Sequence, residues 1–176
     1  MNVNLYDVIS SVGNKKEISV SISDMNVEYL GESISVTGKQ PFTLMIECVA
    51  KDIVRIECDP IVHTVRLCSR CLSDVECDHH IYINRRINVS TGEAYIDDTS
   101  ETDEISYIED CNLDIDKLIL DELFTVLPMN ILCKEDCKGI CKVCGINLNK
   151  SLCDCDQSVP DPRMAVFSDI FKQFDQ

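Results

Sequence analysis

The sequence predicts an α+β protein with an antiparallel β-rich body, two helices and a C-terminal cysteine module. Apolar and polar residues alternate from Ile34 to Ile87, two later stretches have helical spacing, and five of the twelve cysteines lie within 137–155. A chain of 176 residues with 45% apolar residues can bury one ordinary core. We therefore expect a β-rich body with an acidic segment and a helix at 1–128, and a cysteine-rich module with a C-terminal helix at 129–176.

The strands are predicted from period-two alternation. The stretches that show it are "SISVTGK", "FTLMIECVA", "IVRIECDP", "IVHTVRLCS" and "HIYINRRINV", rich in Val, Ile and Thr and broken by Gly, Pro and Asp. Cys48, Cys58, Cys77 and Cys111 lie in or beside this text without paired spacing, and we expect them to fill the core as small hydrophobes. The three histidines, His63, His79 and His80, receive no functional role.

Two helices are predicted after the strands. In "LDIDKLILDELFTVLPM" Asp114 is placed to cap the first turn, and Pro128 ends the helix. The residues that recur at helical spacing there are Ile115, Leu118, Ile119, Leu123 and Val126. In "DPRMAVFSDIFKQF" an N-cap Asp161 precedes Pro162, and the apolar face holds Met164, Phe167, Phe171 and Phe174. We expect that face to dock on the β body, with a partner's surface as the alternative.

Charge is concentrated in one stretch. The chain has 31 acidic and 16 basic residues, a net charge of −15. Residues 93–122 hold twelve acidic side chains and one lysine, a local charge of −11, and this predicts a linker-like acidic segment. Such a chain is poorly suited to non-specific RNA or DNA binding, which needs a basic face. It has no apolar run of signal-peptide or membrane-spanning length, so we expect a cytoplasmic protein without a membrane partner.

The densest cysteine cluster has metal-ligand spacing. In Cys141-Lys-Val-Cys144-Gly145 two thiolates can chelate one ion, and the glycine lets the backbone turn so that N–H groups point at sulfur. Cys153 and Cys155 supply a second close pair. Four thiolates at this spacing predict a closed tetrahedral zinc site and a zinc-ribbon-like module.

A second site is predicted from distant pairs. Cys68-Ser-Arg-Cys71 has knuckle spacing, and Cys133 and Cys137 are the obvious partners from the far end of the chain. Together they form a second four-thiolate set. The alternative is that Cys137 joins Cys141 and Cys144, which leaves Cys133 spare.

Three kinds of chemistry suit these cysteines. Structural zinc is favoured because paired thiolates without a flanking His or carboxylate leave no open catalytic position. An iron site or iron–sulfur cluster is an alternative, since thiolates alone ligate those as well. Redox dithiol chemistry at Cys68 and Cys71 or at Cys141 and Cys144 is the third, although neither pair precedes a clean helical pattern that would lower a thiol pKa.

An ordered set of motifs resembles a known family. The motifs are "CSRCL" (68–72), "LP" (127–128), "CKEDCKGICKVCGINLN" (133–149), "CDC" (153–155) and "DPRMAVF" (161–167). They resemble the YceD family of bacterial proteins, described as large ribosomal RNA subunit accumulation proteins. The resemblance implies a non-enzymatic factor needed for accumulation of 23S rRNA and for assembly of the large ribosomal subunit. Some members lack the C-terminal cysteines, which makes the ribbon an accessory to that function.

The charge pattern suggests how such a factor binds. Residues 133–155 are slightly basic, with Lys134, Lys138, Lys142 and Lys150 against Glu135, Asp136 and Asp154. Our hypothesis is that 93–122 receives a Lys/Arg-rich large-subunit ribosomal protein while the ribbon touches pre-rRNA; the alternative is that the acidic run is a solvated loop.

Other functional classes remain as alternatives. No phosphate-cradling glycine loop or nucleophile with an evident base is present, and the sequence gives no sign of a small-molecule substrate, so we do not expect an enzyme. The alternative class is a cytoplasmic thiol or iron–sulfur redox protein. A third hypothesis is an adaptor that regulates another process through protein contacts.

Overall fold

The computed structural model describes residues 1–95 and 101–155. The helix predicted from Asp161 onward lies outside the described residues. The elements of the described part are β1 (Asn2–Asn4), α1 (Tyr6–Ile9), β2 (Lys15–Val20), β3 (Met25–Tyr29), β4 (Glu32–Gly38), β5 (Phe42–Ala50), β6 (Ile53–Cys58), β7 (Ile61–Leu67), β8 (Asp74–His80), β9 (Ile83–Asn88), β10 (Glu93–Tyr95), β11 (Thr102–Glu104), β12 (Ile108–Glu109), β13 (Asn112–Asp114) and α2 (Ile115–Val126). The predicted α+β class with an antiparallel β-rich body is confirmed. The four-residue helix α1 was not predicted.

The chain divides into two compact units. The first comprises Met1–Leu67 and Asp74–Ile131, and the second comprises Cys68–Ser73 together with the chain from Leu132 onward. The second unit therefore combines a six-residue loop from the middle of the sequence with the C-terminal cysteine-rich segment. The division into domains at 1–128 and 129–176 remains a prediction.

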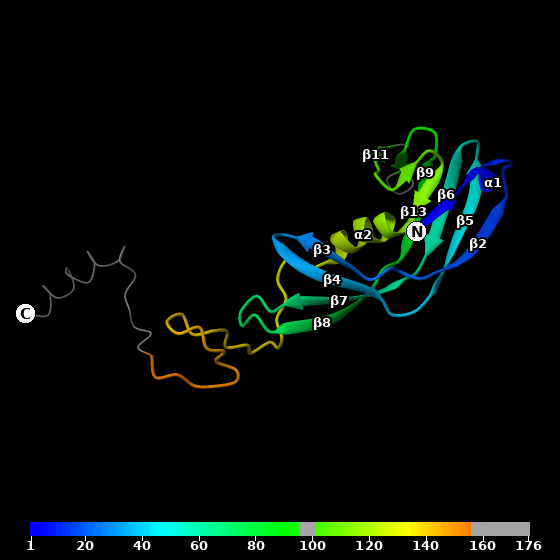
Figure 1. Cartoon of the computed structure of the whole chain (residues 1–176). Helices are drawn as coiled ribbons and strands as arrows, with labels where there is room; N and C mark the ends of the chain where they lie inside the picture. The colour runs from blue at the N-terminus through cyan, green and yellow to red at the C-terminus, as the bar shows by residue number, and fades with distance from the viewer. Residues whose placement is uncertain (96–100, 156–176) are drawn as a thin grey trace, which may run out of the picture. The chain divides into compact units, whose positions relative to one another are not determined.

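Three antiparallel sheets form the first unit (Figure 1). The largest has six strands in the order β11-β10-β9-β6-β5-β2, the next has four in the order β3-β4-β7-β8, and the smallest is β1-β13-β12. The N-terminal strand pairs with β13 late in the chain, with Val3 opposite Leu113. Long-range strand pairing thus holds the first and the later parts of this unit together.

One long hairpin runs through two of these sheets. Cys58 is opposite Ile83 in the β6–β9 ladder, and Ile61 is opposite His80 in the β7–β8 ladder, so the register continues unbroken from one sheet to the next. The ladder ends with Leu67 opposite Asp74. The six residues left between these partners, 68–73, carry the first predicted cysteine pair.

Alternation in the strands builds the core as expected. The first unit has one hydrophobic cluster in which β5 contributes Leu44 and Ile46, while β6 contributes Val54 and Ile56. Cys48 and Cys58 are 1% and 4% exposed in this core, which confirms their predicted role as small hydrophobes. Cys111 is partly buried against it, whereas Cys77 on β8 is partly exposed and outside it, because its side chain lies on the half-exposed face of that strand.

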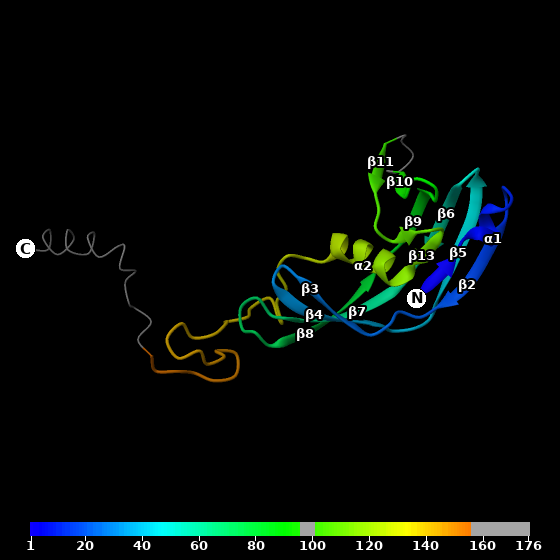
Figure 2. The ribbon, with the colours of Figure 1, turned by 45° about the horizontal axis from the view of Figure 1, so that its top comes forward.

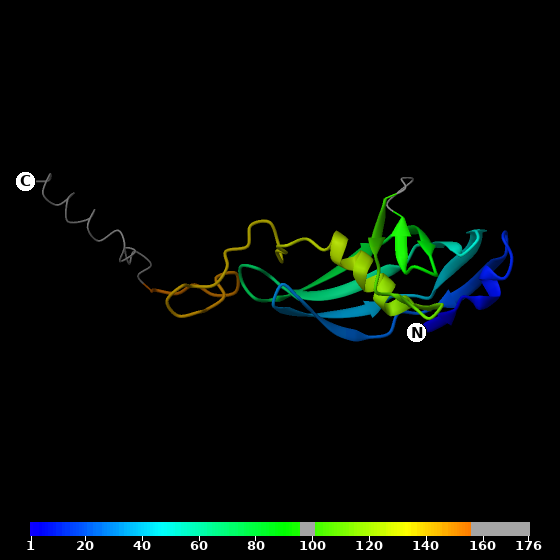
Figure 3. The same cartoon turned by 90° about the horizontal axis from the view of Figure 1, so that it is seen from above.

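Helix α2 forms where the apolar spacing predicts it. The Asp114 carboxylate accepts hydrogen bonds from the N–H groups of Asp116 and Lys117, which is the predicted N-cap. The helix ends at Val126 with Leu127 extended, as expected for a residue before Pro128. Its buried residues are Ile115, Leu118, Ile119 and Leu123, whereas Val126 is 46% exposed. Figures 2 and 3 show α2 lying over the strands of the body. No helix in 1–95 or 101–155 is long and apolar enough to cross a membrane.

The acidic stretch was wrongly predicted to be linker-like where it is described. Residues 93–95, 102–104, 108–109 and 112–114 are strands, and Ile115 begins α2. The reason is that apolar residues are interspersed among the acids: Tyr107, Ile108 and Leu113 are buried in the core. Burial of these side chains holds the backbone in place, while acids such as Asp103, Glu104 and Glu109 are exposed to solvent.

A buried arginine fixes the chain after α2. Arg66 on β7 is 3% exposed, and its guanidinium donates to the Glu32 carboxylate at 3.2 and 3.3 Å and to the carbonyl of Pro128 at 2.6 Å. It also lies over the Tyr29 ring, 5.4 Å from the centroid. The contact brings together two stretches that precede cysteine pairs, since Cys68 follows Arg66 by two residues and Cys133 follows Pro128 by five.

Candidate metal centres

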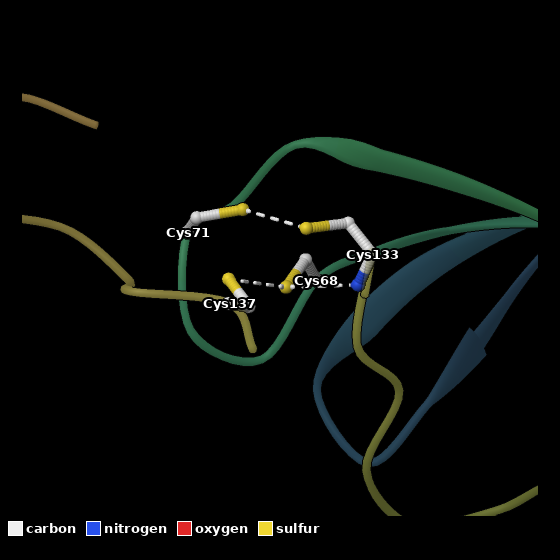
Figure 4. A group of neighbouring side chains, drawn as sticks. All are labelled: Cys68, Cys71, Cys133 and Cys137. Carbon is white, nitrogen blue, oxygen red and sulfur yellow. Dashed lines mark hydrogen bonds between the residues drawn. The ribbon is translucent and has the colours of Figure 1, made fainter. Parts of the chain in front are cut away.

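The first cluster consists of Cys68, Cys71, Cys133 and Cys137. Their sulfur atoms all lie within 4.8 Å of one another. Figure 4 shows the two pairs facing each other, with 3.8 Å between the Sγ atoms of Cys68 and Cys137 and 3.5 Å between those of Cys71 and Cys133. A tetrahedral ion with sulfur ligands at about 2.3 Å requires sulfur–sulfur distances of about 3.8 Å. The four thiols therefore stand close to a tetrahedral coordination shell.

Backbone turns aim the first pair of this cluster. The N–H of Cys68 donates to the Ser73 carbonyl at 2.8 Å, and the N–H of Leu72 donates to the Cys68 carbonyl at 2.9 Å. Leu72 takes a positive φ of 57°, which closes the loop tightly. The N–H of Cys133 donates to the Cys68 sulfur at 3.4 Å. This loop is a metal-knuckle turn with its N–H groups directed at sulfur.

The thiols of the first cluster differ in acidity. The Ser73 hydroxyl, then its backbone N–H, lower the pKa of Cys71 to about 6, because hydrogen bonds favour the thiolate. Burial raises the pKa of Cys68, but hydrogen bonds from the N–H groups of Arg70, Cys133 and Cys71 lower it by more. The pKa of Cys68 is therefore below its ordinary value. The neighbouring Cys71 raises the pKa of Cys133 to about 12. Four sulfurs this close cannot all carry charge without a cation among them.

The second cluster consists of Cys141, Cys144, Cys153 and Cys155, whose sulfurs also lie within 4.8 Å of one another. The N–H of Gly145 donates to the Cys141 carbonyl at 2.9 Å, and the N–H of Val143 donates to the Cys141 sulfur at 3.4 Å. Gly145 has a φ of +74°, so the glycine after the knuckle provides the predicted backbone turn. The Cys-x-Cys pair then completes the set from the other side of the cluster.

The thiols of the second cluster differ in pKa, as those of the first cluster do. The N–H groups of Cys144 and Val143 lower the pKa of Cys141 to about 6. The Cys144 thiol raises the pKa of Cys155 to about 12. The repeated pattern has one cause: N–H or O–H donors in each knuckle favour a thiolate, whereas neighbouring thiols raise the pKa values of Cys133 and Cys155.

Two asparagines, Asn147 and Asn149, support the first cluster, and neither was assigned a role from the sequence. The Asn149 amide donates to the Cys137 sulfur at 3.2 Å, and its oxygen accepts from the N–H of Lys138 at 2.9 Å. Asn147 donates to the Ser73 hydroxyl at 3.1 Å and accepts the Asn149 N–H at 2.9 Å. The segment Ile146–Leu148 also pairs with the strand that enters the second knuckle, through the Cys141 N–H and the Gly139 carbonyl. The spacing N-x-N is the signal that could have found them.

Arg70 and Gly139 allow close contact between the two stretches of chain that carry the first cluster, 68–73 and 133–139. Arg70 donates to the Cys137 carbonyl at 3.0 Å. Gly139 has a φ of +78°, and a Cβ there would lie 3.1 Å from the Arg70 carbonyl oxygen. The loop 68–73 and the chain around 137–139 are therefore in close backbone contact.

Sulfur takes the place of a hydrophobic core in the second unit. Among its residues in 68–73 and 132–155, the buried ones are Cys68, Cys71, Cys137 and Cys141, together with Gly139. Apolar side chains such as Val143 and Leu152 are 59% and 87% exposed. Apolar burial alone cannot hold such a segment in one conformation. An ion at each cluster would supply the missing stabilisation, and each cluster can hold one.

The predicted sets of four are brought together as proposed from the sequence. Cys137 lies with Cys68, Cys71 and Cys133, and the alternative that joins it to Cys141 and Cys144 is not the arrangement observed. His63 contacts Asp78 at 2.7 Å and His79 contacts Thr64 at 2.9 Å, both on β7–β8 and outside either cluster.

Comparison with known proteins identifies relatives of this chain. A family model described as "Large ribosomal RNA subunit accumulation protein YceD" matches residues 62–171. An uncharacterised protein of Mycobacterium tuberculosis is 32% identical over 131 residues, 71% of this chain and 50% of that protein. An uncharacterised protein of Mycobacterium leprae is 28% identical over 105 residues, 60% of this chain and 47% of that protein. The chain thus spans about half the length of these mycobacterial relatives.

A third relative carries a functional name. The "Large ribosomal RNA subunit accumulation protein YCED homolog 1, chloroplastic" of Arabidopsis thaliana is 34% identical over 64 residues, 36% of this chain and 20% of that protein. No solved structure matches the chain. The family model covers more than half of the sequence, from β7 through both cysteine clusters. The chain therefore belongs to the YceD family.

Proposed function

We propose that this protein is a non-enzymatic factor that supports accumulation of 23S rRNA and assembly of the large ribosomal subunit by binding to the assembling particle. Membership of the YceD family is the observation that carries this proposal. The name of the Arabidopsis relative, which states the same process for that protein, supports it.

The role proposed for the cysteine clusters is structural zinc binding. Within residues 1–95 and 101–155, each cluster groups four cysteine sulfurs without a histidine or carboxylate, and four such ligands would fill a tetrahedral shell and leave no position for a substrate or an activated water. Zinc suits such closed thiolate sites, whereas iron is the weaker alternative. The chemistry that zinc would supply here is folding energy for the second unit, whose burial is almost confined to sulfur.

The partner proposed for the acidic residues 93–122 is a Lys/Arg-rich protein of the large subunit. Strands β10 to β13 and α2 hold the described acids of this stretch, in 93–95 and 101–122, in regular structure, which favours a defined contact over a solvated loop. Charge complementarity would steer the association, and salt would weaken it. The test replaces Asp97, Asp98, Glu101, Asp103 and Glu104 with the corresponding amides. Unchanged affinity for basic ribosomal proteins would reject the contact.

One observation favours a redox function as a second candidate. Cys71 and Cys141, each in a Cys-x-x-Cys pair, have pKa values lowered to about 6, which is the acidity of a reactive thiolate. The same hydrogen bonds, however, stabilise a metal-bound thiolate equally well. Insulin-disulfide reduction by the metal-free and the metal-loaded protein separates the two functions. A structural site predicts no turnover in either state.

The proposed function is tested in cells that carry a deletion of the gene. Loss of the protein is expected to lower the ratio of 23S to 16S rRNA and to deplete large subunits on sucrose gradients. The wild-type gene should restore both. The Cys77→Ser variant is a suitable control for cysteine loss outside the clusters, because Cys77 is partly exposed on β8. A normal rRNA ratio and normal subunits after deletion would contradict the proposal.

A further inference from the structure

The strand β8 forms an open edge of the four-stranded sheet. It is the last strand in the order β3-β4-β7-β8, and within 1–95 and 101–155 only β7 pairs with it (Figure 1). Its seven residues make it the longest edge strand that the structure describes, and all of them are exposed or partly exposed. A strand of this kind presents backbone N–H and C=O groups with which another chain can pair.

The register determines which backbone groups of β8 face outward. Directly opposite residues of antiparallel strands alternate between pairs that exchange hydrogen bonds and pairs that do not. The N–H of Ile81 donates to the Pro60 carbonyl at 3.1 Å, and this pair continues the register of the β7–β8 ladder. Alternation from this bond makes Val75, Cys77 and His79 the residues that bond to β7. The outward-facing N–H and C=O groups therefore belong to the other residues of the strand: Asp74, Glu76, Asp78 and His80.

Charge and apolar surface alternate along this edge. Asp74, Glu76 and Asp78 point to one face of the strand, and all three are exposed. Val75 and Cys77, the residues between them, are half-buried on the opposite face. A strand added to β8 would therefore meet carboxylates on one face and apolar side chains on the other. Alternate residues of an extended chain can match such a pattern.

Two of the three carboxylates have no counter-charge in the described part of the chain. Asp78 contacts Lys39 and lies 2.7 Å from the His63 ring. Asp74 and Glu76 form no salt bridge with any residue of 1–95 or 101–155. A basic partner would supply the missing charge, and each such pair would add a modest stabilisation because both groups are exposed.

The composition of β8 favours a strand from another protein over a second copy of this chain. Natural edge strands are often protected by lysine, proline or a bulge, and β8 has none of these. Two β8 strands paired with each other would place carboxylates opposite carboxylates, which destabilises a sheet. A strand that carries lysine or arginine would instead meet these carboxylates with opposite charge.

From this arrangement we propose that β8 pairs with an extended segment of a partner protein in which Lys or Arg alternates with apolar residues. The pairing is antiparallel, as is every strand pair in the described part of this chain. The basic residues of the segment lie opposite Asp74, Glu76 and Asp78. The assignment of the segment to a large-subunit ribosomal protein rests on the proposed function, whereas the strand pairing rests on the edge alone.

Binding of a designed peptide tests the pairing. The probe is a labelled eight-residue peptide with blocked ends that alternates Lys with Val, and its fluorescence anisotropy is measured with the purified full chain. A peptide of the same composition, with its lysines and valines in two blocks, should bind about tenfold more weakly because its charges cannot all face the carboxylates. Equal affinity of the two peptides would overturn strand pairing in favour of general charge attraction.

Methylation of the peptide backbone tests the register. In a hydrogen-bonded antiparallel pair, directly opposite residues exchange both of their backbone bonds, so the N–H groups of the lysines would bond to β8. Methylation of the lysine backbone nitrogens should abolish binding, whereas methylation of the valine backbone nitrogens should leave the peptide bound. Equal binding of the two methylated peptides would overturn the proposed register.

Substitutions on the two edges of the sheet test the site. Glu76→Gln should weaken peptide binding about threefold, since an exposed ion pair contributes little. Glu76→Pro should weaken it about tenfold, because proline removes an outward N–H while the bonds of Val75 and Cys77 to β7 remain. Glu28→Gln and Glu28→Pro are the matched controls, since Glu28 is exposed on β3, the other edge of the same sheet, and they should leave the affinity unchanged.

Circular dichroism establishes that these variants fold. Equal peptide binding by the two proline variants would overturn β8 as the site. A dimer of the free chain that dissociates with Glu76→Pro would overturn the partner segment in favour of a second copy.

The outcome for the edge is separable from that for the proposed function. The 23S to 16S ratio in deletion cells tests the function without reference to peptide binding by the purified protein. If the deletion lowers the ratio and Glu76→Pro binds the peptide as the wild type does, the function stands and the edge proposal fails. If the deletion leaves the ratio unchanged and Glu76→Pro loses the peptide, the reverse holds.

Discussion

Each of the two cysteine clusters offers four cysteine sulfurs, but the clusters differ in how far apart their cysteines lie in the sequence. In the first, Cys68 and Cys137 are 69 residues apart and Cys71 and Cys133 are 62 apart, and three of the four cysteines are buried. In the second, all four lie between 141 and 155, and only Cys141 is buried. The first cluster joins distant stretches of chain, whereas the second organises a single local loop. A metal lost from the first should therefore have the wider structural consequence.

Replacement of one cysteine in each cluster should have the largest effect. Cys71→Ser removes a ligand that joins the loop 68–73 to residues 133–137, so we expect one metal ion fewer and tryptic cleavage at Lys134 and Lys138 about tenfold faster. Cys144→Ser should also lose one ion, but cleavage should rise only at Lys142 and Lys150. Limited proteolysis with mass spectrometry reads both, and Cys77→Ser is the control. Identical cleavage patterns for the two variants would remove the distinction between the clusters.

In the metal-free protein, the cysteines within each cluster should react with alkylating reagents at different rates. At pH 7 the pKa values of about 6 for Cys71 and Cys141 leave these thiols mostly ionised, whereas the values of about 12 for Cys133 and Cys155 leave theirs protonated. Iodoacetamide should alkylate the first two about a hundredfold faster, because the thiolate is the nucleophile. Lowering the pH below 6 should slow the alkylation of Cys71 and Cys141, since their stabilised thiolates are then increasingly protonated. Peptide mapping of the alkylated sites gives the order, and preferential labelling of Cys133, which is exposed, would contradict it.

The asparagine link should affect the first cluster more than the second. Asn149→Ala removes the hydrogen bond to the Cys137 sulfur, and loss of such an outer contact typically weakens metal binding by about tenfold or more. Competition with a chromophoric chelator measures the affinity of each site. Asn130→Ala, at an exposed asparagine before the first cluster, is the matched control and should change neither site. Equal affinities for Asn149→Ala and the control would mean that the link has no role in metal binding.

Alanine substitution of one glycine near each cluster should give the smallest difference in metal affinity between the two sites. Gly139 and Gly145 both have positive φ, so alanine strains the backbone by about 1 kcal/mol at either position. At Gly139 the new Cβ would also lie 3.1 Å from the Arg70 carbonyl, whereas at Gly145 nothing lies within 4 Å. Gly139→Ala should therefore weaken the first site more than Gly145→Ala weakens the second. The reverse order in the same chelator titration would show that the contact with Arg70 is not important.

Elements with local sequence signals were predicted correctly, whereas elements that depend on long-range contacts were missed. The cap at Asp114 and the stop before Pro128 are local signals, and both are confirmed. The four-residue helix α1 has no side-chain cap and no periodic pattern, so its sequence holds no signal of it. The acidic strands were missed because their few apolar residues acquire meaning only when Leu113 pairs with Val3 across the whole first unit.

For the two cysteine clusters, too, local spacing could be used for prediction and long-range contacts could not. Knuckle spacing was enough to group the second cluster, since its members are neighbours in the sequence. The first cluster was predicted from the knuckle spacing of Cys68 and Cys71 and a distant pair, Cys133 and Cys137, and in the structure Cys137 lies with this set. Arg70 could not be predicted, because its importance lies in a contact with Cys137, 67 residues away. Asn149 contacts Cys137 from 12 residues away, and its N-x-N spacing was the one local signal.

Metal bound in two closed four-thiolate sites should give the second unit its fold. Elemental analysis of the full chain, purified under anaerobic reducing conditions, measures this metal. We expect about two zinc ions per chain, one for each cluster, and about one in either single-cluster variant. Iron in place of zinc, or a metal-free protein that keeps its second unit folded and resistant to trypsin, would contradict it.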